Sequence, residues 1–532
     1  MLATALLAAS PAWANTDDVA LAAYVKARAA DAAGAAHDAA AGYAAALGAM
    51  PGNRDVALRA YREALEAGDD ALAIRAANIL AAGDDAPDDV ALFRIAVAAR
   101  DGDMASIEPA LTKLKGTPFA FIAGPVRAWQ AFVMGNDPLP FVEPGKGANA
   151  LEAGYDAESR ALLEIALGKI DDASATLQML LVADPASIDL RCNAAQALAA
   201  QGKADLGQAL LQGDNPILAA CAAGLGGGVK PSFAFGVSRL FTRLGSDLSN
   251  GKVSTLAIVV DRAALIAEPG NDRARLLLAG AIAQDGAPDY ATATLAAIGP
   301  GHSLHDVAED ERIAVLQGSD DPQALAAARK RAAAPGATAA DARQLGMLLS
   351  AAGDNSHAAA AFALALKRAG RDAEWTYHLQ LGGALEQAGR WPEGRAELKR
   401  ALALAPDEPL ALNYLGYADI EHGEAFAPAL KLLERAHSLA PDNGSITDSL
   451  GWALYRSGDT QRALPLLEEA AVAEPANTTI SEHLGDAYWA LGRRYEARYA
   501  WAAARVSADT ADAARLTRKI ADGPGPRTAE AH

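Results

Sequence analysis

The sequence is poor in the features that mark membrane-spanning and cysteine-rich proteins. Its 532 residues include two cysteines, six methionines and 5% aromatic residues. No run of roughly 18 apolar residues occurs, so the sequence predicts no membrane-spanning helix. Two cysteines are also too few for a fold that depends on many disulfides.

The two cysteines, Cys192 and Cys221, leave two interpretations open. In an oxidising compartment they could form a disulfide, provided that their Cα atoms lie within about 7 Å. They could instead be two separate buried residues. We favour the second interpretation from the sequence, because free cysteine behaves as a small apolar residue and is commonly buried.

The chain also lacks an excess of basic residues. It has 47 Lys and Arg against 66 Asp and Glu, which gives a net charge of −19. A protein that binds nucleic acid needs a basic face, and an anionic membrane surface attracts basic segments. The charge therefore argues against nucleic acid as a partner and disfavours a membrane surface.

Motifs for catalysis and cofactor binding are missing as well. The sequence has no His-Glu-x-x-His, Gly-x-Ser-x-Gly or Cys-x-x-Cys. The glycines at 224–228 are not followed by the adjacent Lys and Ser or Thr of a phosphate-binding loop. His302 and His305 form an isolated pair beside a Gly-Pro-Gly turn, where a metal is disfavoured. We expect a protein that is not an enzyme and holds no metal or cofactor.

What the sequence does contain is a repeat of 34 or 35 residues. Four units in residues 375–507 each hold a Leu-Gly pair and a second glycine seven residues later, and the first three units end in proline. A fixed period in this range predicts pairs of helices that stack on one another. The residues are Gly382, Gly416, Gly451 and Gly485, then Gly389, Gly423, Gly458 and Gly492, and Pro406, Pro441 and Pro475.

Each recurring residue has a physical reason. The first glycine lets the paired helix approach closely, and the second tolerates the positive φ with which a chain leaves a helix. Proline ends the second helix because it lacks an N–H and clashes with the preceding turn. Turn glycines recur upstream and bring the expected total to fourteen helix pairs. They are Gly34, Gly68, Gly102, Gly135, Gly168, Gly202, Gly251, Gly286, Gly318 and Gly353.

This pattern resembles the tetratricopeptide repeat. The resemblance implies an all-α fold, a right-handed α-solenoid of about fourteen helix pairs. It is strong over residues 375–507 and weaker upstream.

Three runs within the repeats are more particular: Asn413-Tyr-Leu-Gly-Tyr417, Asp448-Ser-Leu-Gly-Trp452 and His483-Leu-Gly-Asp486. They resemble a group of exported proteobacterial repeat proteins. One branch of that group is an outer-membrane lipoprotein that acts as adaptor for a periplasmic carboxyl-terminal processing protease. This sequence lacks the lipidated cysteine of that branch, so the resemblance leaves the partner open.

We expect five segments. Residues 1–14 are predicted to be a signal peptide, because an apolar start ends in Ala12-Trp13-Ala14, the form of a signal-peptidase site. No cysteine lies beside that site, so the expected product is a soluble periplasmic protein without a lipid anchor. Degenerate repeats follow in 15–223 and, after a glycine-rich break, in 224–374. Well-formed repeats occupy 375–507, and 508–532 form a capping helix and a disordered tail.

Aromatic residues concentrate in residues 375–532, which hold five of seven Trp and seven of twelve Tyr. In the repeat family, the positions around the first glycine line a superhelical groove. Tyr, Trp and Arg commonly anchor protein interfaces, and carboxylates favour a segment with basic or amide donors. The alternative is that the aromatic residues only fill gaps between inner helices. The predicted partner-binding groove comprises Asn413, Tyr417, Asp448, Trp452, Tyr455, Arg456, Glu482, Asp486 and Trp489.

These features predict a non-catalytic periplasmic scaffold or adaptor. Its expected partners are proteins, with a periplasmic protease or a peptidoglycan enzyme as the leading kind. One alternative is a structural component of an envelope or polysaccharide export assembly, and a less favoured one is an all-α enzyme. The sequence does not fix the oligomeric state.

Overall fold

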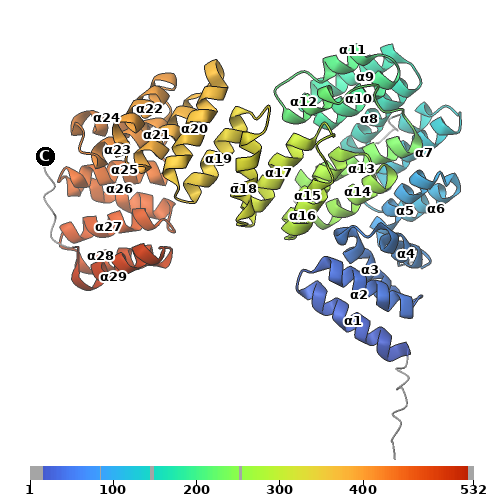
Figure 1. Cartoon of the computed structure of the whole chain (residues 1–532), viewed down its shortest axis with the longest axis horizontal. Helices are drawn as coiled ribbons and strands as arrows, with labels where there is room; N and C mark the ends of the chain where they lie inside the picture. The colour runs from blue at the N-terminus through green and yellow to red at the C-terminus, as the bar shows by residue number, and fades with distance from the viewer. Residues whose placement is uncertain (1–15, 84, 144–148, 251–253, 525–532) are drawn as a thin grey trace, which may run out of the picture. The chain divides into compact units, whose positions relative to one another are not determined.

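The computed structural model of the chain describes residues 16–83, 85–143, 149–250 and 254–524. Within these ranges it contains 29 α-helices and four short 3-10 helices, and no strand (Figure 1). The all-α fold predicted from the sequence is confirmed. The chain divides into two compact units, Met1–Ala324 and Leu325–His532. The predicted signal peptide, residues 1–14, lies outside the described residues.

The first unit contains seventeen α-helices and three 3-10 helices. The α-helices are α1 (Thr16–Ala32), α2 (Ala36–Ala49), α3 (Arg54–Ala67), α4 (Asp70–Ala81), α5 (Asp88–Asp101), α6 (Ile107–Leu114), α7 (Ala123–Val133), α8 (Ala150–Ala166), α9 (Ile170–Ala183), α10 (Ile188–Ala200), α11 (Ala204–Leu210), α12 (Pro216–Ala223), α13 (Phe233–Asn250), α14 (Ser254–Ala267), α15 (Asp272–Gln284), α16 (Pro288–Ala296) and α17 (His305–Gly318). The 3-10 helices are η1 (Met104–Ser106), η2 (Ala120–Ile122) and η3 (Leu139–Val142).

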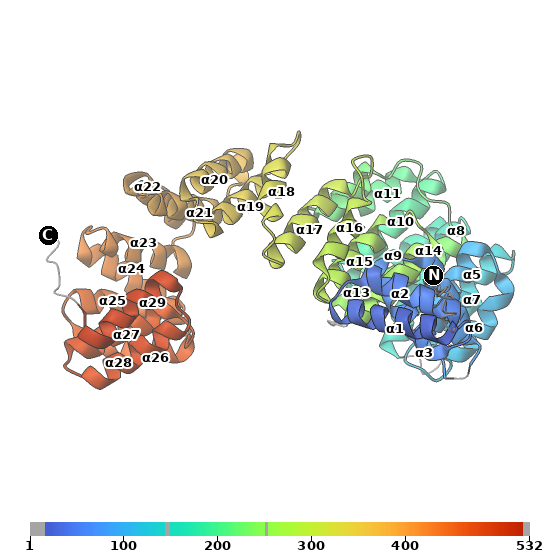
Figure 2. The ribbon, with the colours of Figure 1, turned by 60° about the horizontal axis from the view of Figure 1, so that its bottom comes forward.

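Consecutive helices of the first unit pack against each other, and its second half also returns to its first half. Helix α14 packs against α5 and α3, and α13 packs against α5 and α7 (Figures 1 and 2). The Nε atom of Arg262 donates to the carbonyl of Leu65 at 3.0 Å. One continuous core runs from Ala27 to Val315. The first unit therefore differs from a linear array in which each repeat touches only its neighbours.

Two glycines bring α13 close to other elements. A Cβ atom at position 236 would lie 2.1 Å from the ring of Trp129, and one at position 245 would lie 1.9 Å from Oδ1 of Asp261. Asp261 is completely buried, and neither of its carboxyl oxygens has a hydrogen-bond partner among the described residues. Burial raises the pKa of the Asp261 carboxyl well above its ordinary value.

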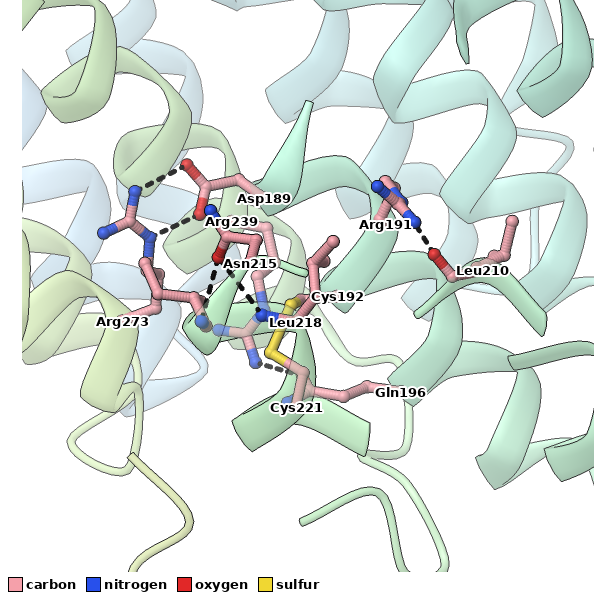
Figure 3. Close-up of a disulfide and its surroundings, with 11 residues drawn as sticks. Asp189, Arg191, Cys192, Gln196, Leu210, Asn215, Leu218, Cys221, Arg239 and Arg273 are labelled. Atoms are coloured by element: carbon pink, nitrogen blue, oxygen red, sulfur yellow. Dashed lines mark hydrogen bonds and ion pairs between the residues drawn. A yellow bond between two sulfur atoms is a disulfide. The ribbon is translucent and has the colours of Figure 1, made fainter. Parts of the chain in front are cut away.

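A disulfide joins α10 to the short helix α12. Cys192 and Cys221 are bonded, with their Cα atoms 5.9 Å apart, inside the reach that a disulfide requires. Figure 3 shows the bond beside Leu218, which is buried in the same apolar cluster. The favoured interpretation of two separate buried cysteines was wrong. The path of the chain through the intervening helix α11 brings the two side chains together, and this path is not visible in the sequence.

The glycine-rich stretch that was expected to interrupt the helices is non-helical, at residues 224–232 between α12 and α13. It crosses α10 closely, since a Cβ atom on Gly228 would lie 2.1 Å from the carbonyl oxygen of Gln196. The division between the two compact units falls later, after residue 324. The finer boundaries after residues 223, 374 and 507 remain predictions.

The second unit contains the other twelve α-helices, with α18 beginning two residues before it, and a 3-10 helix. They are α18 (Gln323–Ala333), α19 (Ala339–Ala351), α20 (Asn355–Ala369), η4 (Gly370–Asp372), α21 (Trp375–Gln387), α22 (Trp391–Leu404), α23 (Pro409–Glu421), α24 (Phe426–Leu439), α25 (Gly444–Arg456), α26 (Thr460–Ala473), α27 (Thr478–Ala490), α28 (Arg494–Val506) and α29 (Thr510–Asp522).

The two glycine positions of each unit act as predicted from residue 375 onward. A Cβ atom at the first glycine would lie 2.4–2.9 Å from the large residue of the paired helix. The turn glycines have φ between 69° and 90°. These pairs are Gly382 with Leu398, Gly416 with Leu433, Gly451 with Leu467, and Gly485 with Trp501; the turn glycines are Gly389, Gly423, Gly458 and Gly492.

Eight of the ten upstream turn glycines also have positive φ: Gly34, Gly68, Gly102, Gly135, Gly168, Gly202, Gly286 and Gly353. The prediction for Gly318 was wrong, because Gly318 is the last residue of α17 and Asp320 takes the positive φ of 55° instead. Gly251 lies outside the described residues.

Helix α29 covers the end of the repeats, close to the expected capping helix. Asp509 caps it by accepting from the backbone N–H of Asp512, and Leu516 is buried. Arg498 of α28 donates to the carbonyl of Ile520 at 2.8 Å. Across the described part of the chain, none of the helices combines the length and apolar character needed to span a bilayer.

Candidate partner-binding cavity

A cavity of about 390 Å³ lies in the second unit, along the first helices of four consecutive repeats. Helix α21 contributes Glu386 and Gln387, and the start of α27 contributes Asn477, Thr479 and Ile480. The helices between them form the long walls. This volume is within the range of sites that hold a ligand or a peptide side chain.

Helix α23 contributes one wall through residues that share a helix face, at positions i, i+1, i+4, i+5 and i+8. They are Asn413, Tyr414, Tyr417, Ala418 and Glu421. Pro409 at the first turn and the side chain of Glu408, which accepts from the N–H of Leu410, begin this helix.

Helix α25 contributes the other wall through Ser445, Asp448 and Ser449. The side chain of Asn443 caps this helix by accepting from the N–H of Ile446. Its first turn is held by Glu474 at the end of α26 in the same repeat, which accepts from the N–H of Ser445 at 2.7 Å. Local caps therefore set where both helices start, and so which side chains face the cavity.

The cavity wall is acidic and rich in acceptors. It has one carboxylate from each of three helices, Glu386, Asp448 and Glu421, and none of its lining residues is Lys, Arg or His. Burial is the main reason that the pKa of Tyr414 is raised to about 12, and the negative charge of the nearby Glu386 contributes to the rise. Burial is also the main reason that the pKa of Tyr417 is raised well above its ordinary value, and the charges of Glu421 and Asp448 contribute. Both tyrosines therefore stay neutral and present a hydroxyl and a ring face.

Residues behind the wall hold two of these carboxylates. The Nε2 atom of His422 lies 2.9 Å from Glu386, and the His422 ring stacks on Trp391 with centroids 4.2 Å apart. The Nδ1 atom of His483 lies 2.9 Å from Asp448. Each imidazole contacts its carboxylate through one ring nitrogen, and a carboxylate has about four lone-pair sites, so acceptor sites remain for further donors.

The third carboxylate, Glu421, is held from α25. Its Oε1 accepts from Trp452 Nε1 at 2.9 Å and from Arg456 at 3.0 Å. Trp452 also stacks on His483, with centroids 3.8 Å apart, and on Tyr455. Trp452, Tyr455 and Arg456 thus flank the cavity and support its wall.

One acceptor in the cavity wall lacks a partner. The Oδ1 atom of Asn413 is buried and has no hydrogen-bond partner within the described part of the chain. A buried polar atom without a partner is uncommon in native proteins. An N–H donor from a bound molecule would satisfy it.

The structure brings together three of the nine predicted groove residues, Asn413, Tyr417 and Asp448. It places three others, Trp452, Tyr455 and Arg456, beside them. The predicted set of groove residues did not include the wall residues Glu386 and Glu421. Glu421 lies four residues after Tyr417, the spacing of one helix face, and this signal could have identified it.

The last three predicted residues, Glu482, Asp486 and Trp489, contact α29 and its C-cap instead of the cavity. Lys519 lies 2.6 Å from Glu482 and 2.8 Å from Asp486. A Cβ atom on Gly523 would lie 2.2 Å from the Trp489 ring. In this structure the capping helix and its C-cap contact these residues, and Asp486 and Trp489 stay partly exposed.

His302 and His305, the pair considered as a metal site, each contact another residue of the protein. His302 lies 2.6 Å from Asp272, and His305 lies 2.8 Å from the carbonyl of Ile298. Among the residues that the structure describes, no cluster of three or more His, Cys, Asp or Glu side chains is arranged to hold a metal ion.

Comparison with known proteins supports the repeat assignment. A 71-residue stretch is 39% identical to a TPR repeat-containing protein of Pseudomonas aeruginosa. The matched stretch is 13% of this chain and 12% of that relative. The likeness supports the tetratricopeptide interpretation. No protein-family model matches the chain.

Two solved structures are similar in fold. A thermophilic TPR protein of Thermus thermophilus shares 20% identity over 35% of this chain and 100% of its own, with a TM-score of 0.32. The APC/C hetero-tetramer Cut9-Hcn1 shares 14% identity over 94% of this chain and 96% of the matched chain, with a TM-score of 0.38. Likenesses at this level say nothing about function.

Proposed function

We propose that the protein is an exported, non-catalytic scaffold that binds a segment of a partner protein in the cavity lined by α21, α23, α25 and the start of α27. The observation that carries this proposal is the cavity itself. Four consecutive repeats contribute side chains to its continuous wall. An extended segment that runs across stacked repeats could contact each repeat in turn.

Export is supported by the disulfide between Cys192 and Cys221. Disulfides persist in oxidising compartments such as the bacterial periplasm and are rare in the cytosol. This agrees with the signal peptide expected in residues 1–14. The resemblance to exported repeat proteins makes a periplasmic protease or a peptidoglycan enzyme the leading kind of partner.

The binding proposal is tested by blocking the cavity without touching its core. Thr479 is exposed at the cavity rim, near the start of α27, so Thr479→Trp should fill the opening while the helix stays intact. Thr510→Trp, at an exposed position that starts α29, is the matched control. Both proteins would be used to capture partners from envelope extract, with the captured proteins identified by mass.

We expect a partner that wild type and Thr510→Trp capture equally and that Thr479→Trp captures at least about tenfold less. Equal capture by all three proteins would show that the partner docks elsewhere. Export has a separate test, because N-terminal sequencing of the purified native protein should find a start near Asn15. An intact Met1 on cytosolic material would contradict export.

A further inference from the structure

We propose that the cavity recognises an arginine side chain of the bound segment. This inference rests on the proposed function, and it names the chemistry that the partner must supply.

The first argument is charge. The wall carries Glu386, Glu421 and Asp448, and no lining residue is cationic. Behind the wall, the one permanently charged partner of these carboxylates among the described residues is Arg456, which contacts Glu421. Together, these three carboxylates and Arg456 carry an excess of two negative charges. A segment that placed a carboxylate here would meet like charge, and a cation meets complementary charge.

The second argument is hydrogen bonding. The buried Oδ1 of Asn413 has no hydrogen-bond partner among the described residues. As an amide oxygen it can only accept, so its partner must be a donor. Both contacts to Glu421 use its Oε1, so its Oε2 remains available to a ligand. The site therefore offers acceptors to a group that has several N–H donors and no acceptor, which describes a guanidinium or an ammonium.

The third argument distinguishes the guanidinium from the ammonium. The acceptors come from three helices, α21, α23 and α25, so they are spread along the cavity wall. A compact ammonium satisfies acceptors only around one point, whereas a guanidinium spreads five donors over a planar fork. Tyr414 and Tyr417 also line the cavity, and a planar guanidinium stacks well on aromatic faces.

The test uses short random peptides displayed on phage, selected at pH 8 against the full wild-type chain. Thr479→Trp serves as counter-selection, so that only peptides that need the open cavity are kept. Each arginine in a selected peptide is then replaced by citrulline, which keeps the shape but loses the charge, and by lysine. Affinities are measured by fluorescence anisotropy.

We expect the selected peptides to share an arginine whose replacement by citrulline weakens binding by at least about tenfold, with lysine intermediate. Glu386→Gln combined with Asp448→Asn should lower the affinity for the arginine peptide. It should also remove most of the difference in affinity between the arginine and citrulline peptides. Glu434→Gln combined with Glu469→Gln removes the same charge from exposed faces of α24 and α26. This control should change neither the affinity for the arginine peptide nor its difference from the affinity for the citrulline peptide.

Peptides that require the open cavity but tolerate citrulline, or that bind equally with lysine, would overturn the arginine inference and leave the proposed function standing. A selection that yields no peptide sensitive to Thr479→Trp would contradict both. Because the citrulline comparison changes only the peptide, it remains informative even where a protein variant folds poorly.

Discussion

The Nδ1 atom of His483 lies 2.9 Å from the carboxylate of Asp448, one repeat earlier in the chain, and both side chains are buried. The imidazole ring of His483 stacks on Trp452, at a centroid distance of 3.8 Å. An aromatic residue expected to anchor a partner thus also holds the histidine that orients a cavity carboxylate. Its replacement should affect the fold as well as the cavity.

Trp452→Ala should lower the free energy of unfolding by about 1–3 kcal/mol. It removes a stacked pair, worth about 0.5–1.5 kcal/mol beyond area, and the packing of a half-buried indole. Tyr495→Ala on α28, where the side chain is 79% exposed, is the control and should change stability by less than about 0.5 kcal/mol. Urea unfolding followed by circular dichroism measures both, and equal effects would contradict the stacking argument.

Gly485→Ala should destabilise the second unit by about 1–3 kcal/mol, because its Cβ atom would lie 2.4 Å from the ring of Trp501 in the paired helix. Gly154→Ala is the matched control. A Cβ atom there meets nothing within 4 Å, so alanine should stabilise α8 by up to about 1 kcal/mol. Thermal unfolding of the two variants should shift in opposite directions. A shift in the same direction would mean that the close approach at Gly485 does not limit packing.

Loss of the disulfide should destabilise the first unit. Cys192 and Cys221 are 29 residues apart, and chain entropy alone assigns a loop of this size about 3–4 kcal/mol. Cys192→Ser combined with Cys221→Ser should melt earlier than wild type, and reductant should lower the wild-type melting temperature without affecting the variant. If reductant shifts both proteins equally, the effect does not come from this bond.

Asp261 should make the stability of the first unit depend on pH. Its pKa in the folded state is raised above the unfolded value of about 3.9 by burial, with Arg273 and Asp189 as the nearby charges. Its stabilising contribution is therefore complete below about pH 4 and is lost as pH rises toward the folded-state pKa.

Asp261→Asn does not titrate, so the difference in unfolding free energy should move in favour of the variant between pH 4.5 and pH 8. Urea unfolding at both pH values measures this difference. Asp205→Asn, at an exposed position on α11, is the control and should show little change with pH. A pH-independent difference for Asp261→Asn would show that this carboxyl is not buried in its neutral form.

The repeat positions could be predicted because they are local. Gly451 faces Leu467 and Gly458 ends its helix for reasons contained within one period of the sequence. The return of α14 onto α3 and α5 could not, since Arg262 meets Leu65 across 197 residues with no periodic signal. The contact of Lys519 with Asp486 also escaped prediction, because a position in the predicted groove becomes covered only where the array ends.

The same reasoning explains the cavity. The face made by Asn413, Tyr417 and Glu421 follows from helix periodicity, whereas the orientation of the Glu421 carboxylate depends on Trp452 and Arg456 of the next repeat. Contacts between repeats decide which polar groups line the wall. The sequence alone therefore indicates which face of a helix lies toward the cavity, but not which polar groups line the cavity wall.

The most direct measurement of partner binding places a photo-crosslinking phenylalanine analogue at Tyr417, in the cavity wall, and in a second strain at Tyr495, on the exposed face of α28. Irradiation of living cells followed by mass spectrometry identifies what each position touches. If the cavity lined by α21, α23, α25 and the start of α27 binds a partner segment, position 417 should capture a specific protein that position 495 does not. Capture of the same protein only from position 495, or of none from position 417, would contradict the proposal.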